Sequence, residues 1–206
     1  MQIIGSQTSP FVRMVRTTCE ELNQPYELLE TGFFVNMSKE ANALVNANNP
    51  LMKVPVLHDG DKSIIDSRII INYLINKSGD NANTDFSTTI NDEQQNLITV
   101  ILGIADAAVL RFIFGKTTDL DPDKGYLKRS FTRIETGLAY LNEQSDNKQG
   151  DLGKTFGVPE LMLLCLLQWF KKRDICDWGI YDNLVTIHDR YKDRDSVIKT
   201  AIPEEA

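Results

Sequence analysis

The chain is poor in the residue types that build metal sites and disulfide frameworks. Its 206 residues include two histidines, His58 and His188, and three cysteines, Cys19, Cys165 and Cys176. Two isolated histidines disfavour a metal centre, because imidazole and thiolate are the usual ligands of transition metals. Three widely spaced cysteines, an odd number, indicate reduced thiols. We therefore predict no metal cofactor and no structural disulfide.

Long apolar runs and basic clusters are also missing. The longest apolar stretch, residues 161–167, is far shorter than the ~20 residues that cross a bilayer. The N-terminal residues lack the basic, apolar and small-residue succession of a signal peptide. Lys and Arg total 22 against 29 Asp and Glu, a net charge of −7, and no long basic block occurs. These absences predict a cytoplasmic protein that binds neither membranes nor nucleic acid.

The first 77 residues alternate between strand and helix patterns. Ser9 followed by Pro10 predicts a helix start, because serine caps free N–H groups and proline fits the first turn. Apolar residues then recur at helical spacing until Asn23 and Pro25 end the helix. A polar segment with a short helix near 39–45 follows, and another helix begins after a hairpin. We predict a small mixed sheet covered by helices, with strands at residues 2–5, 26–29, 55–58 and 63–65.

Beyond residues 78–90, only helices are predicted. The segment 78–90 is rich in Ser, Gly, Asp and Asn, which is typical of a linker. Two long amphipathic segments follow, and the run 161–167 is apolar on every side, which indicates a helix buried within a bundle. Gly157 fits the N-cap of that helix and Glu160 its third position, so the Glu160 carboxylate is expected to reach back to the N-cap N–H.

Residues 53–67 predict a site for a small peptide. Pro55 lacks an N–H donor and belongs at the start of an edge or ligand-facing strand, where a cis Val54–Pro55 bond fits. Such a bond would turn the Val54 backbone outward, toward an extended peptide. Asp66 and Ser67 stand where a helix begins, and its free N–H groups favour an anion such as an α-carboxylate.

Taken in order and spacing, these motifs resemble the cytosolic glutathione S-transferases over essentially the whole chain. The Ser-Pro-Phe-Val segment is similar to that of the plant tau class and of bacterial relatives with serine in that place. In the omega class a cysteine precedes the Pro-Phe pair. The resemblance is carried by residues Thr8–Arg13, Asn49-Pro50, Lys53–Leu57, Asp66-Ser67 and the helix start Phe156–Leu161.

The resemblance implies a thioredoxin-like α/β N-terminal domain at residues 1–77 and an all-α C-terminal domain at 91–206, joined by the linker 78–90. It also implies a homodimeric, cytoplasmic transferase of the detoxification type, with glutathione as co-substrate and no metal. The family's central helix usually begins with Ser or Thr and has Asp three residues later. Here Gly157 and Glu160 stand there, which predicts a weaker cap with the fold retained.

The resemblance also assigns the residues of the site. Ser9 is the catalytic hydroxyl, and Val54 gives a main-chain contact to the cysteinyl part of glutathione. Asp66 and Ser67 hold its γ-glutamyl end, and Lys53 contacts its glycine carboxylate.

The resemblance also assigns Phe11 to the residues that bind glutathione. A second pocket, for the other substrate, is expected beside Phe11. Arg111 and Phe114 of the helical domain are further candidates for lining that pocket.

Three functions fit these residues. The first is glutathione transfer to a small electrophile, in which Ser9 donates a hydrogen bond to the sulfur; no histidine base lies nearby to make Ser9 a nucleophile. The second is a glutathione-dependent reductase or isomerase, although thiol–disulfide exchange needs a protein thiol where Ser9 stands. The third is a non-catalytic protein-binding or regulatory module with a transferase-like fold. The presence of Ser9, Pro55, Asp66 and Ser67 favours the enzyme.

Overall fold

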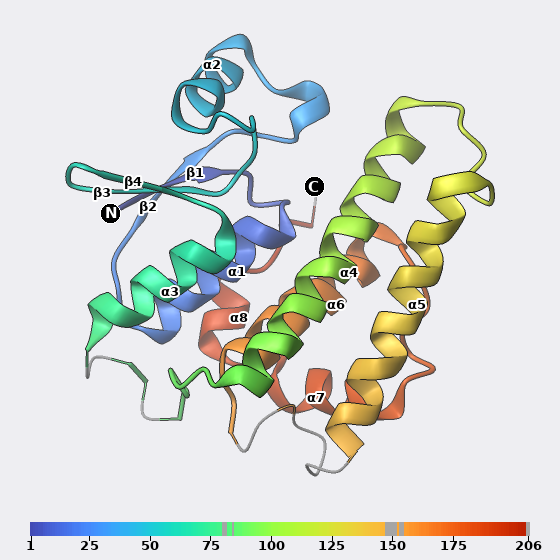
Figure 1. Ribbon diagram of the computed structural model, residues 1–206. Coiled ribbons are helices and arrows are strands. Elements are labelled where there is room, and N and C mark those ends of the chain that lie inside the picture. The colour runs from blue at the N-terminus through green and yellow to red at the C-terminus, as the bar shows by residue number, and fades with distance from the viewer. Residues whose placement is uncertain (80–81, 84, 147–151, 153–154, 205–206) are drawn as a thin grey trace. The chain divides into compact units, whose positions relative to one another are not determined.

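A computed structural model describes residues 1–79, 82–83, 85–146, 152 and 155–204 of the chain (Figure 1). Its contacts divide the chain into two compact units. The first unit joins Met1–Thr88 with Arg194–Ala206, and the second is Thr89–Asp193. The sequence predicts that residues 194–206 belong to the helical domain, whereas in the structure residues 194–204 group with the first unit.

The first unit is built on the mixed four-stranded sheet that the sequence predicts. Its strands are β1 (Gln2–Gly5), β2 (Glu27–Glu30), β3 (Val56–Asp59) and β4 (Lys62–Ile65), in the order β2-β1-β3-β4. β1 runs parallel to β2 and antiparallel to β3, and β3 and β4 form the hairpin. Together with the helices, this is the thioredoxin-like arrangement expected.

Helices lie on both faces of this sheet: α1 (Pro10–Glu21) and α3 (Ser67–Ser78) on one, α2 (Lys39–Asn48) on the other (Figure 1). A short 3₁₀ turn η1 (Phe34–Asn36) precedes α2, and α8 (Asp195–Lys199) packs on α1. Gly5 permits the close approach of β1 to α1, because a Cβ at this position would lie 2.4 Å from Cγ2 of Val12. A core cluster forms under α2, where Ile4, Val45 and Val56 are fully or almost fully buried.

The described part of the second unit is helical and contains α4 (Asp92–Thr117), α5 (Gly125–Asp146), α6 (Val158–Arg173) and α7 (Asp182–Tyr191). Residues 161–167 of α6 are all buried, as the sequence predicts. The predicted cap is also confirmed: Gly157 is the N-cap residue, and its N–H donates to Oε2 of Glu160 at 3.0 Å.

Helix α4 is long and apolar enough to cross a bilayer by length and composition alone, a test that the core helices of soluble proteins also pass. Within its unit α4 contacts α5 and α6. Its fully buried residues include Ile101, Ala105 and Ala108. The buried apolar residues of α4 therefore serve packing inside the second unit.

Candidate active site

Ser9 begins α1 as the sequence predicts. Its oxygen accepts a hydrogen bond from the Val12 N–H at 3.4 Å, and Pro10 occupies the first turn. The Ser9 N–H donates to the carbonyl of Ser6 at 3.0 Å, which closes the turn that leads into the helix. The Ser9 side chain is half-buried, and within the described part of the chain its hydroxyl proton has no acceptor. The hydroxyl is therefore held in place by its oxygen while its proton remains available.

The turn that carries Ser9 is fixed by a residue that the sequence did not single out. Glu30, at the end of β2, accepts from the Gln7 N–H at 2.9 Å and from the Gly32 N–H at 3.0 Å. β2 pairs in parallel with β1, with Gly5 opposite Glu30, so the end of β2 lies beside the turn after β1. An acidic residue at the end of a strand parallel to β1 is the signal that would have found it.

Val54 and Pro55 stand immediately before β3, and the bond between them is cis. The Val54 side chain packs against the core cluster under α2. Its N–H makes no hydrogen bond to any residue that the structure describes. Lys53 is exposed. The backbone of Val54 is thus free to pair with an extended ligand, as its position before a proline predicts.

Asp66 is the N-cap of α3. Its Oδ1 accepts from the N–H groups of Arg68 at 2.9 Å and Ile69 at 3.4 Å. The residue has φ +75°, in the left-handed region that costs a non-glycine residue about 1–3 kcal/mol. Ser67 is buried at the first helical position, whereas Asp66 is exposed. The two hydrogen bonds hold the Asp66 carboxylate at the helix start in this conformation.

Strand register brings the three site segments together. Ile4, Val56 and Ile65 lie opposite one another across β1, β3 and β4. Since β3 runs against both neighbours, the turn after β1, the residues before β3 and those after β4 meet at the same end of the sheet. These segments carry Ser9 with Phe11, Lys53 with Val54, and Asp66 with Ser67.

No cysteine lies in the three segments that meet at this end of the sheet. Burial raises the pKa of Cys19 to about 12, and Cys165 is fully buried. Burial also raises the pKa of Cys176, in the second unit, to about 11. Among the residues that the structure describes, no group of three or more His, Cys, Asp or Glu side chains is placed to hold a metal ion.

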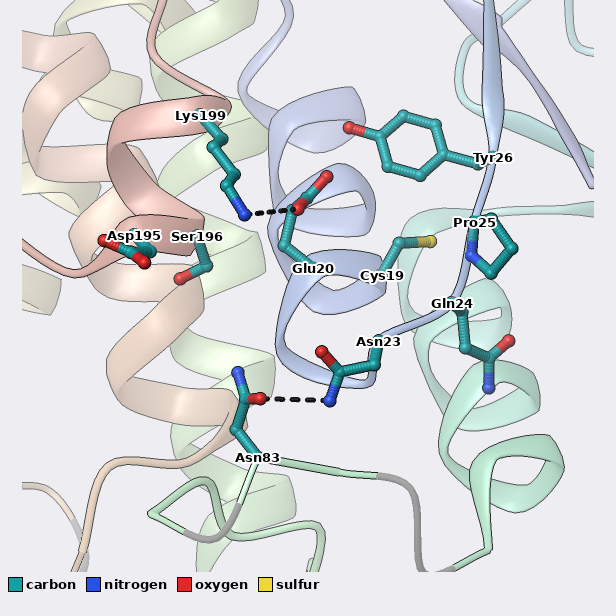
Figure 2. A pocket seen from close by; sticks show the side chains of 10 residues that line it. All are labelled: Cys19, Glu20, Asn23, Gln24, Pro25, Tyr26, Asn83, Asp195, Ser196 and Lys199. Atoms are coloured by element: carbon teal, nitrogen blue, oxygen red, sulfur yellow. Dashed lines mark hydrogen bonds and ion pairs between the residues drawn. The ribbon is translucent and has the colours of Figure 1, made fainter.

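A cavity of about 600 Å³ lies elsewhere on the first unit, at the C-terminal end of α1 and beside α8 (Figure 2). Its wall is crossed by a hydrogen bond from Asn23 to Asn83 at 3.0 Å and an ion pair between Lys199 and Glu20 at 3.7 Å. None of the predicted site residues lines it. Glu20 and Asp195 contribute two carboxylates and Lys199 one ammonium, so this cavity is polar and its charges are mixed.

Arg194 forms ion pairs at the same end of the first unit, and the sequence analysis did not identify it. Its guanidinium binds the carboxylate of Glu21 through Nε and Nη2, both at 2.9 Å, and Asp85 through Nη1 at 2.7 Å. Glu21 is 1% exposed and also accepts from Ser196 and Asn83. Burial acts to lower the pKa of Arg194, but its hydrogen bonds to the two carboxylates raise it overall.

Arg111, a candidate for the second-substrate pocket, has a structural role in the second unit. Its Nη1 donates to the carbonyl oxygens of Pro122 at 2.6 Å and Leu127 at 3.3 Å. Its guanidinium also lies 4.7 Å from the ring centroid of Phe131. These contacts hold the turn between α4 and α5. Phe114 is half-buried on α4.

Comparison with known proteins gives one consistent result. Residues 3–82 match the family model of the glutathione S-transferase N-terminal domain. Glutathione S-transferase U17 of Arabidopsis thaliana is 24% identical over 187 residues, which cover 85% of this chain and 75% of that protein.

Solved structures are similar over the whole length. A glutathione S-transferase from Methylobacillus flagellatus, solved with glutathione bound, has a TM-score of 0.84 at 23% identity and covers 98% of this chain and 99% of its own. Another, from Methylobacterium radiotolerans in complex with glutathione sulfonate, has a TM-score of 0.80 at 24% identity, covering 98% and 94%. These likenesses show a shared fold.

Proposed function

Because residues 3–82 match the N-terminal domain of glutathione S-transferases, we propose that this chain is a glutathione S-transferase that transfers glutathione to a small electrophile, with Ser9 activating the thiol. The observation that carries the proposal is the start of α1. The Ser9 oxygen accepts from the Val12 N–H, which leaves the hydroxyl proton free for a sulfur acceptor. The dipole at the N-terminus of α1 also favours the negative charge of a thiolate bound there.

The energetic demand on Ser9 is modest. A free thiol has a pKa of about 8.5, so only a few per cent is ionised at pH 7. Lowering that pKa by ~2 units requires ~2.7 kcal/mol of preference for the thiolate. A hydrogen bond to a charged acceptor contributes ~1.5–3 kcal/mol, and a helix N-terminus ~0.3–1 kcal/mol. The hydroxyl of Ser9 is therefore the larger contribution, and the dipole of α1 supplies the rest.

The reaction follows from these groups. The thiol proton leaves to solvent, and the Ser9 O–H donates to the resulting thiolate. A sulfur electron pair then attacks the electrophilic carbon and forms the C–S bond. A leaving group departs with its bonding pair, or, for an activated alkene, the neighbouring carbon takes a proton from water. Ser9 stays uncharged and forms no covalent bond.

The remaining site residues are assigned to the three parts of glutathione. Val54 pairs its main chain with the cysteinyl part, and its unused N–H supports this role. Asp66 and Ser67 bind the γ-glutamyl end, which the exposed carboxylate at a helix start supports. Lys53 is exposed and carries the charge that a glycine carboxylate needs. Phe11 borders the site of the electrophile.

A reductase that exchanges disulfides is disfavoured by the positions of the thiols. Position 9 carries no sulfur, and Cys19 and Cys165 are fully buried. We further propose that the protein is homodimeric and cytoplasmic, as the family implies.

The test measures glutathione binding by calorimetry and the thiolate absorbance near 240 nm against pH, in wild type, Ser9→Ala and Ser38→Ala. Ser38 is the matched control because it caps α2 in the same way, accepting from the Ala41 N–H at 3.1 Å. Each variant is expected to lose about 1 kcal/mol of stability. Only Ser9→Ala should raise the pKa of the bound thiol, by ~1–2 units, and slow conjugation.

Equal thiolate titrations in Ser9→Ala and wild type would refute the role of Ser9. Absence of glutathione binding by wild type would refute the enzyme and favour a protein-binding module.

A further inference from the structure

We propose that Asn49 is a positioning residue that aims the Val54 N–H at the ligand. The inference rests on the proposed function, since Val54 matters only if glutathione binds there. It concerns a side chain that touches no substrate and acts through the loop between α2 and β3.

Asn49 is 3% exposed and ends α2, where its own N–H donates to the carbonyl of Val45. Its side-chain amide spans the loop. Oδ1 accepts from the Leu51 N–H at 2.9 Å, and Nδ2 donates to the Lys53 carbonyl at 2.7 Å. The Asn49 carbonyl also accepts from the Met52 N–H at 2.9 Å. One buried residue thus bonds to three successive loop residues.

The decisive contact is the one to the Lys53 carbonyl. That carbonyl and the Val54 N–H belong to one planar trans peptide unit, so they point in opposite directions. Holding the Lys53 oxygen inward on Nδ2 of Asn49 turns the Val54 N–H outward. The Val54 N–H has no acceptor within the part of the chain that the structure describes, as a ligand-facing donor requires.

The loop would not keep this orientation by its own preference. Met52 has φ +54°, a left-handed conformation that side chains other than glycine and asparagine rarely adopt. The loop residues Leu51 and Met52 are 64% and 69% exposed, so packing does little to hold them. The hydrogen bonds of Asn49 therefore replace packing as the source of order in this loop.

Asn49→Asp is the discriminating variant. It keeps an oxygen for the Leu51 N–H and replaces the donor to Lys53 with an oxygen that repels that carbonyl. The matched control is Asn48→Asp, because Nδ2 of Asn48 donates to the Leu44 carbonyl at 2.8 Å and makes no hydrogen bond to any loop residue that the structure describes. Thermal unfolding shows whether each variant is folded.

We expect Asn49→Asp to raise the Kd for glutathione about tenfold. The pKa of the bound thiol and kcat at saturating glutathione should stay unchanged, because Ser9 is untouched. γ-Glutamylcysteine, which lacks the glycine carboxylate, should lose the same factor. Lys53→Ala, in contrast, should weaken only glutathione. Asn48→Asp should change neither ligand.

Three results would overturn the inference. If wild type binds glutathione and Asn49→Asp binds it equally well, Asn49 does not position the Val54 N–H and the proposed function stands. If the loss is confined to glutathione, Asn49 acts through the Lys53 side chain. If wild type binds neither ligand, the proposed function fails and the inference fails with it.

A second measurement covers the case in which Asn49→Asp does not fold. In wild type labelled with ¹⁵N, the Val54 amide proton is expected to exchange rapidly with water. On addition of glutathione it should shift downfield and become protected. A Val54 amide that is protected before glutathione is added, or that glutathione leaves unchanged, would overturn the inference.

Discussion

Replacing Arg194 by methionine should destabilise the first unit by about 3 kcal/mol. The change removes both hydrogen bonds that the guanidinium makes to the carboxylate of Glu21, which is 1% exposed. Removing one partner of a buried ion pair costs ~3–5 kcal/mol, because the other charge is left uncompensated. Ser196 and Asn83 still donate to Glu21, which favours the lower end of that range.

The second partner of Arg194 contributes little by comparison. The side chain of Asp85 is 68% exposed, so its pair with Arg194 is screened by water. Asp85→Asn should therefore cost less than about 1 kcal/mol. The hydrogen bond from Arg194 lowers the pKa of Asp85. The stabilisation from this ion pair is therefore fully present at pH values above the ordinary pKa of aspartate. It is lost as the pH falls through the lowered pKa of Asp85.

For Asp85→Asn, the small loss of stability relative to wild type should not change between pH 7 and pH 5, because Asp85 remains ionised throughout that interval.

Thermal and urea unfolding followed by circular dichroism provide the assay. A loss of about 3 kcal/mol lowers the midpoint by about 6–12 °C for a chain of this size. Lys192→Met is the control, because Lys192 forms an exposed pair with Asp189 at 2.9 Å, and the variant should leave the midpoint almost unchanged. An Arg194→Met midpoint equal to that of Lys192→Met would refute the reasoning.

Two further predictions concern buried groups. Because burial raises the pKa of Cys19 to about 12, Cys19 should resist an aromatic disulfide reagent at pH 7 until the protein unfolds, as should the fully buried Cys165; rapid labelling of Cys19 in peptide mass spectra of the folded protein would contradict this. Glu160→Ala removes the acceptor for the Gly157 N–H and should cost at least ~1 kcal/mol in urea unfolding, whereas Glu160→Gln keeps an oxygen there and should cost less; equal losses would show that the cap is not the reason.

Features governed by local chemistry were predictable from the sequence. Serine before proline, aspartate before a helix, and glycine with glutamate three residues on all formed the expected caps, because each cap is decided within four residues. The cis bond before Pro55 belongs to the same class. The alternation of strand and helix patterns in the sequence predicted the sheet, although β2 begins at Glu27 and not at the predicted Tyr26.

Features governed by distant pairing were not predictable. Glu21 and Arg194 are separated by 173 positions, and nothing near either residue marks it as buried or paired. The Asn49-Pro50 motif was recognised, but the hydrogen bonds of Asn49 depend on the left-handed conformation of Met52, which the sequence does not signal. Helix α2 continues to Asn48, beyond the predicted end at Val45. The roles of Ser9, Val54 and Asp66 in binding glutathione stay predictions.

The first unit also has a consequence for the way the protein is made. Glu21 leaves the ribosome 173 residues before its partner Arg194. At about 5–20 residues per second, the interval is roughly ten to thirty seconds. During that time α1 has no α8 to pack on, and the Glu21 carboxylate must remain in water. The unit that is translated first is therefore completed only after the whole second unit has been synthesised.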